Sequence, residues 1–197
     1  MKKLFLITIA VILAMPFGAQ GAQYRKKLKE YKRAGWELYA SSQTMKDALR
    51  NHYKALEREG TFEVVGTANG IQNESVGRQL AWTNACISYV QQAGNLLRGR
   101  VDTDGYTASG KKSDFVNFYA AFETLLQKEI RGEMKPSFTL IRYNDDGTSD
   151  IMSFFVVDEE AAVQARIRAM EHAAKESEAA RNIASRIREF VKEGFSE

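Results

Sequence analysis

Cysteine is almost absent from this sequence of 197 residues, which contains only Cys86. One cysteine excludes an internal disulfide framework, so the stability of the fold must come from a packed core. In the stretch QLAWTNACISYVQQA (79–93), helical spacing groups Cys86 with Trp82, Tyr89 and Ala93. A thiol in such a group behaves as a small apolar side chain, which predicts that Cys86 contributes to packing rather than to chemistry.

Histidine is equally scarce, and this argues against metal and nucleophilic chemistry. His52 and His172 lie on separate expected helices, without a second ligand at the spacing of a zinc site. No sequence feature brings either histidine to Cys86 as a base, and no serine nucleophile motif is present. We therefore expect no metal, no cofactor and no enzymatic activity. A hydrolase with an unrecognised site remains an alternative.

Long apolar runs are lacking after the first residues. Lys2 and Lys3 are followed by the apolar run Leu4 to Phe17 and by a small-residue site that predicts cleavage between Gly21 and Ala22, the pattern of a secretory signal peptide. The run is shorter than the roughly 20 residues that a spanning helix needs. No cysteine follows the cleavage site, so no lipid anchor is expected, and about 176 residues remain for one domain.

An excess of charge of one sign is also lacking. Without Lys2 and Lys3, 26 basic side chains face 25 acidic ones, so global charge does not indicate a nucleic-acid partner. A basic segment (22–34) opens the mature chain, with a possible contact to lipid head groups or an acidic partner. The residues of this possible basic contact are Arg25, Lys26, Lys27 and Lys29. A solvated helix or tether is the alternative interpretation.

Two loops resemble ligand-binding motifs incompletely. The run Gly105 to Lys112 fits a phosphate-binding loop until its last position, where Lys112 replaces the required Ser or Thr. The acidic runs 102–105 and 144–147 lack the later ligands of a calcium loop. Turn formation explains both acidic runs.

Hydrophobic periodicity predicts the following elements along the chain. We expect a strand over 36–40, a helix on Met45, Leu49, Tyr53 and Leu56, a strand over 61–68, and a helix that begins after Asn73 or Ser75. On this last helix, Leu80, Thr83, Ile87, Val90, Gly94 and Leu97 form an apolar stripe that is expected to be buried, flanked by small residues that allow close packing on a sheet (Ala81, Ala85 and Ser88). A short strand over 99–104, a helix with an aromatic face from Phe115 to Leu126, and a hairpin of strands 137–143 and 150–157 follow.

The C-terminal region is expected to be one long helix from Asp158, its cap, to Lys192 or Glu193. At 1.5 Å per residue this helix would be roughly 50 Å long and would project beyond the domain. Its second half then offers a possible partner surface, formed by Ile183, Ile187, Phe190 and Val191. A break near Ser177, which would fold the helix back, is the alternative.

The chain resembles the LPP-twenty-like envelope domain superfamily, which includes small outer-membrane lipoproteins and the N-terminal domain of flagellar assembly protein T. The resemblance covers about residues 34 to 195 and is strongest to exported members from Bacteroidota. It is carried by Arg78-x-x-Ala81-x-x-x-Ala85 and by the hairpin through Val157. It implies an α+β domain with a non-enzymatic role at the cell envelope, and it supplies no catalytic residues.

These observations predict an α+β fold of two layers, with helices on one face of an antiparallel sheet, and one domain over residues 35–197. The first functional hypothesis is an exported, non-enzymatic envelope protein of the periplasm or outer-membrane periphery. It would act through contacts with an envelope protein or through self-association, with at most peripheral membrane contact. The alternative is a periplasmic module that binds a small ligand between the aromatic helix (Phe115 to Leu126) and the sheet.

Overall fold

The computed structural model describes residues 20–106 and 112–193. The helices are α1 (Gln20–Arg33), α2 (Met45–Leu56), α3 (Glu74–Thr103), α4 (Lys112–Glu133), α5 (Glu159–Ala173), α6 (Glu178–Asn182) and α7 (Ala184–Glu193), with a 3₁₀ turn at Ala174–Glu176. The strands are β1 (Glu37–Leu38), β2 (Thr61–Ile71), β3 (Lys135–Tyr143) and β4 (Ser149–Asp158). The predicted strand over 99–104 is wrong, because these residues continue α3 to Thr103.

The strands form one antiparallel sheet in the order β1-β3-β4-β2, which confirms the α+β class. The predicted β3–β4 hairpin is present. Its turn is closed by the N–H of Asn144, which donates to the carbonyl of Thr148 at 2.8 Å, and by Gly147 at a φ of 79°. A positive φ is readily adopted by glycine, which is why this Asx-Gly turn is well predicted.

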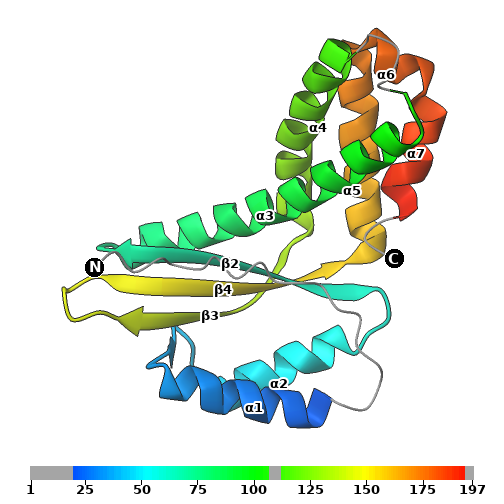
Figure 1. Ribbon diagram of the computed structural model, residues 1–197. Helices are drawn as coiled ribbons and strands as arrows, with labels where there is room; N and C mark the ends of the chain where they lie inside the picture. The colour runs from blue at the N-terminus through cyan, green and yellow to red at the C-terminus, as the bar shows by residue number, and fades with distance from the viewer. Residues whose placement is uncertain (1–19, 107–111, 194–197) are drawn as a thin grey trace.

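Helices cover both faces of the sheet (Figure 1). The prediction of two layers with helices on one face only is therefore wrong. On one side α2 packs through Met45 and Leu49 against Phe138 and Phe154. On the other side α3 packs over β2 and β4, where Phe155 faces the opposite core. The alternation of Phe154 and Phe155 between two cores follows from the two-residue period of a strand.

The basic segment is part of this fold, in α1. Tyr24, Leu28 and Tyr31 pack against the core below the sheet, together with α2. The expected domain start at residue 35 is therefore too late, because an apolar face of α1 lies between the basic residues. The predicted signal peptide falls almost wholly on residues 1–19, outside the described residues.

The helix α3 lies unusually close to β2 through small residues, as predicted for Ala81 and Ala85. Both side chains are fully buried, and a Cβ added at Gly66 would lie 2.7 Å from the backbone N of Ala85. Cys86 is also buried, at 1% exposure, with its sulfur 3.7 Å from that of Met134. Cys86 therefore lies inside the core, as its predicted packing role requires.

The C-terminal region folds back instead of forming one long helix. After Ala173 the chain passes through the 3₁₀ turn to Ser177, whose extended backbone ends the helix and whose hydroxyl accepts the N–H of Ala180 at 3.1 Å. The helix α7 then packs on α5 and α3, as the red and orange helices show (Figure 1). This confirms the alternative of a break near Ser177.

Candidate functional site

The prediction of a partner surface on the last helix is wrong, because the residues of that surface are buried within their own domain. Ile187, Phe190 and Val191 are at most 6% exposed, and Ile183 is partly buried beside them. The reversal at Ser177 turns this apolar face inward. A contact surface must therefore be sought elsewhere.

The residues of the possible basic contact lie on α1. Arg25, Lys26 and Lys29 are exposed, whereas Lys27 is half-buried and forms an ion pair with Glu30 at 3.1 Å. Gly21 and Ala22, which flank the predicted cleavage site, belong to the first turn of α1. All four basic residues therefore lie on α1, and three of them are exposed to solvent.

The expected ligand pocket beside the aromatic helix is filled by side chains. Phe115, Phe118, Phe122 and Leu126 of α4 are at most 2% exposed and form the core shared with α3 and α5. The aromatic face is therefore a packing surface of the core.

The loops that resembled binding motifs serve mainly as turns and helix ends where they are described. Asp104 accepts a hydrogen bond from Arg186 at 3.0 Å, and Asp146 accepts from Thr148. The Thr148 hydroxyl and backbone lower the pKa of Asp146. Residues 107–111 of the phosphate-loop resemblance lie outside the described residues. Within residues 20–106 and 112–193, no group of three or more His, Cys, Asp or Glu side chains could hold a metal.

A histidine network joins α2 to the sheet, and sequence reasoning missed it. The Nδ1 atom of His52 lies 2.9 Å from the Ser137 hydroxyl, and its Nε2 lies 2.6 Å from Oε2 of Glu63. Serine, histidine and glutamate are the residue types of a nucleophile, base and acid. The imidazole, however, is 1% exposed, packs edge-on against Phe138 and Phe154, and uses both nitrogens to hold β2 and β3. This environment is that of a structural histidine.

A buried arginine similarly connects the C-terminal helices to α3. Arg166 is 3% exposed and donates to the carbonyl of Val191 at 2.8 Å, to the Tyr89 hydroxyl at 2.6 Å and to Glu159 at 2.6 Å. Burial opposes its charge, but Tyr89 and Glu159 outweigh that effect and raise the pKa of Arg166. Burial raises the pKa of Tyr89 to about 12. The network stabilises the fold of α5 and α7.

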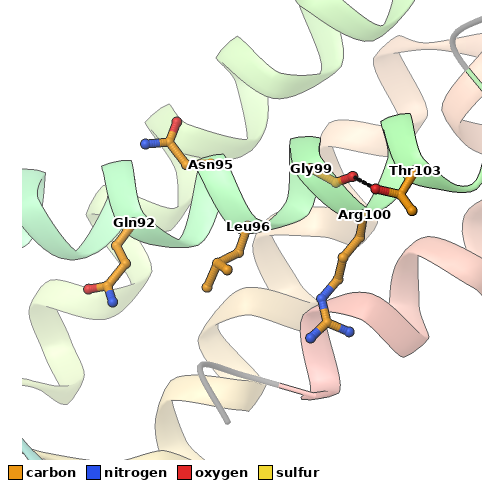
Figure 2. Close-up of a pocket in the computed structure, with 6 residues that line it drawn as sticks. All are labelled: Gln92, Asn95, Leu96, Gly99, Arg100 and Thr103. Atoms are coloured by element: carbon orange, nitrogen blue, oxygen red, sulfur yellow. Dashed lines mark hydrogen bonds between the residues drawn. The ribbon is translucent and has the colours of Figure 1, made fainter. Parts of the chain in front are cut away.

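An open groove lies along the second half of α3 (Figure 2). Its volume is about 450 Å³, and its lining residues all come from this one helix: Gln92, Asn95, Leu96, Gly99, Arg100 and Thr103. The Thr103 hydroxyl already donates to the carbonyl of Gly99 at 2.7 Å. A groove with a single helix as its wall offers amides and one guanidinium, but little enclosure for a small molecule.

The most unusual surface of the molecule is the first half of α3. Val76, Leu80 and Ile87 share one face of the helix and are 52%, 42% and 36% exposed. The prediction that Leu80 and Ile87 are buried is wrong, because α3 turns Ala81 and Ala85 to the sheet and leaves the apolar stripe facing away from it. The stripe becomes buried only from Val90 onward, where α4 covers it.

Leu80 and Ile87 lie on a stretch of α3 that carries no charge. Between Arg78 and Arg98, residues 79–97 contain no Asp, Glu, Lys or Arg, although charged residues make up 27% of the chain. We call the exposed residues of this region the α3 surface: Val76, Gln79, Leu80, Asn84, Ile87, Ser88, Gln91 and Asn95. Depletion of charge around exposed apolar side chains is typical of the centre of a protein interface.

Comparison of the chain with protein-family models, with curated proteins and with solved structures gives no match. None of the described helices is both long and apolar enough to cross a membrane.

Proposed function

We propose that this protein is an exported, non-enzymatic protein of the cell envelope that acts through protein contacts made by the α3 surface. The observation that carries the proposal is the exposure of Leu80 and Ile87 within a run of helix that has no charge, with the exposed Val76 on the same helix face. Exposed apolar patches on soluble proteins commonly mark interaction sites. The export step is supported by the sequence alone, through the basic start, the apolar run and the small residues at Gly21 and Ala22.

The resemblance to LPP-twenty-like envelope domains supports the same assignment. Its motif residues Ala81 and Ala85 are the ones that allow α3 to lie against β2. A location in the periplasm or at the outer-membrane periphery is part of the same proposal. Mass spectrometry of the mature N-terminus tests export, since we expect it to begin at Ala22. Recovery of the chain from the cytosol alone, with its first residue retained, would contradict it.

A photo-crosslinking amino acid placed at position 80 tests the contact. In native envelopes we expect crosslinks from position 80 to another polypeptide chain. Val116 on α4 provides a matched control, because it is apolar and 59% exposed on a different helix. Equal crosslinking from positions 80 and 116, or none from position 80, would contradict the proposal.

A small-ligand-binding module is the second candidate function, and the groove beside Arg100 favours it. Its residues Gln92 and Asn95 offer hydrogen bonds to a polar ligand. A specific ligand would raise the melting temperature of the protein, and substitution of Asn95 by Leu would abolish that shift. Survival of the shift in Asn95→Leu would exclude the groove as the site.

A further inference from the structure

The strand β2 is an edge of the sheet, and its outward-facing groups can be assigned. Asn144 and Thr148 form a hydrogen-bonded pair, and such pairs recur at every second residue of an antiparallel ladder. The even-numbered residues of β4 therefore bond to β3, and the odd-numbered residues bond to β2. Phe155 and Ser153 of β4 stand opposite Val64 and Gly66. The N–H and C=O groups of Glu63, Val65 and Thr67 therefore point away from the sheet.

The chain itself already satisfies two groups of this open edge. The N–H of Thr61 donates to the carbonyl of Arg58 at 3.1 Å, and the carbonyl of Thr67 accepts from Asn84 of α3 at 2.8 Å. Among the described residues no strand pairs with the outer side of β2. The groups left for a partner strand are those of Glu63 and Val65, the carbonyl of Thr61 and the N–H of Thr67.

We propose that a second copy of this chain pairs with β2 in antiparallel fashion across a two-fold axis at Val64. This inference rests on the proposed function, because it names a partner for the α3 surface. In this register Glu63 faces Val65 of the second copy and exchanges two hydrogen bonds with it. Thr67 donates its N–H to the carbonyl of Thr61 of the second copy. The remaining facing groups, the N–H of Thr61 and the carbonyl of Thr67, are the two that the chain already satisfies.

Neighbouring registers fit less well. An axis at Val65 would direct the N–H of Glu63 at the Thr67 carbonyl, which Asn84 already occupies. An axis at Glu63 would set two Glu63 carboxylates opposite each other, which is destabilising. The two satisfied groups of the edge therefore face each other only between two copies with the axis at Val64.

The helix α3 lies above β2, next to the same axis. Gly66 lies below Ala81 and Ala85, and the ring of Phe62 stacks on Tyr89 at 6.0 Å, so α3 runs along β2. Val64 is thus level with the segment between Ala85 and Tyr89. Two copies would then lie with α3 beside α3, and the α3 residues nearest the edge are uncharged: Asn84, Ser88 and Gln91. No like charges oppose the approach of the two helices.

Sedimentation velocity of the full chain over a roughly hundredfold concentration range tests the proposal. We expect a dimer that persists in Thr67→Ala, which keeps the N–H, and whose dissociation constant rises at least tenfold in Thr67→Pro, which removes it. Thr67 is exposed, and its N–H lies outside the β4 ladder, so both variants should fold. A monomeric wild type, or equal association of the two variants, overturns the proposal.

The register has its own test at Val65, which faces Glu63 of the second copy. Val65→Glu places carboxylates opposite each other and is expected to give a monomer, whereas Val65→Lys is expected to stay dimeric and to weaken with salt. Both variants place a charge at the same half-buried position beside Glu63 of their own strand, and circular dichroism of each variant verifies folding. Identical behaviour of the two overturns the register. A monomeric chain that still crosslinks from position 80 to another protein refutes the dimer and leaves the proposed function intact.

Discussion

Substitution of Gly66 by Ala probes the contact on which the α3 surface depends. The added Cβ would lie 2.7 Å from the backbone N of Ala85 and closer still to the carbonyl oxygen of Ala81. Ordinary contacts of carbon are about 3.5 to 4.0 Å, so α3 would have to move away from β2 by about 1.5 to 2 Å to clear the Ala81 carbonyl oxygen. Neither obstacle can rotate aside, because both are backbone atoms of one helix.

The expected loss of stability follows from that displacement. Overpacking of a core costs about 1 to 3 kcal/mol, and occasionally more. We expect Gly66→Ala to lie at the upper end, at about 3 kcal/mol, because moving α3 also loosens the contacts of Val64, Ala85 and Tyr89. That is a large part of the roughly 5 to 15 kcal/mol that stabilises a typical domain.

Urea unfolding followed by circular dichroism measures the effect. Gly99→Ala is the matched control, because Gly99 lies on α3 and a Cβ added to it has nothing within 4 Å. Helix propensity predicts that this control gains about 0.5 to 1 kcal/mol. If the free energy of unfolding of Gly66→Ala lies within about 0.5 kcal/mol of the wild-type value, close contact between α3 and β2 at this point is refuted.

Three further substitutions or treatments follow from buried groups. Burial opposes the charge of Asp150, but hydrogen bonds, first of all the one from Arg142, outweigh that effect and lower the pKa of Asp150. The ionised carboxylate therefore contributes stability above a pH of about 4, and this contribution is lost as the pH falls through the folded-state pKa. Asp150→Asn should therefore cost about 1.5 to 3 kcal/mol near neutral pH in urea unfolding, with a difference that shrinks in acid. Burial raises the pKa of the Cys86 thiol, so thiol reagents should label it only as fast as the protein opens, and rapid labelling in native buffer would contradict its burial. Arg166→Met removes the donor to Val191 and should cost about 3 to 5 kcal/mol, whereas an unchanged melting curve would show that the network is dispensable.

Local signals in the sequence predicted the elements with clear chemistry at their ends. Thr44, Asn73 and Asp158 each accept backbone N–H groups at the start of a helix, and Gly147 closes the hairpin. These features depend on residues a few positions apart, which is why they can be read without tertiary information.

The arrangement of helices around the sheet could not be predicted in the same way. Periodicity shows that Leu80 and Ile87 share a face with Val90 and Leu97, but not which part of that face another helix covers. The His52 network joins residues that are 11 and 85 positions apart, and no local pattern signals such a meeting. Tertiary packing, which decides both, is a long-range property of the chain.

The apolar stripe of α3 is divided into an exposed first part and a buried second part, and this division connects the fold to the proposed function. From Val90 onward, α4 buries the stripe, and the core gains the free energy of removing those side chains from water. Val76, Leu80 and Ile87 continue the same stripe but contribute little to the stability of the chain on its own, because they remain exposed. Charged side chains in their place would favour solubility, yet residues 79–97 contain none. Stability of the isolated chain therefore does not explain this surface, which is why we propose that another polypeptide covers it.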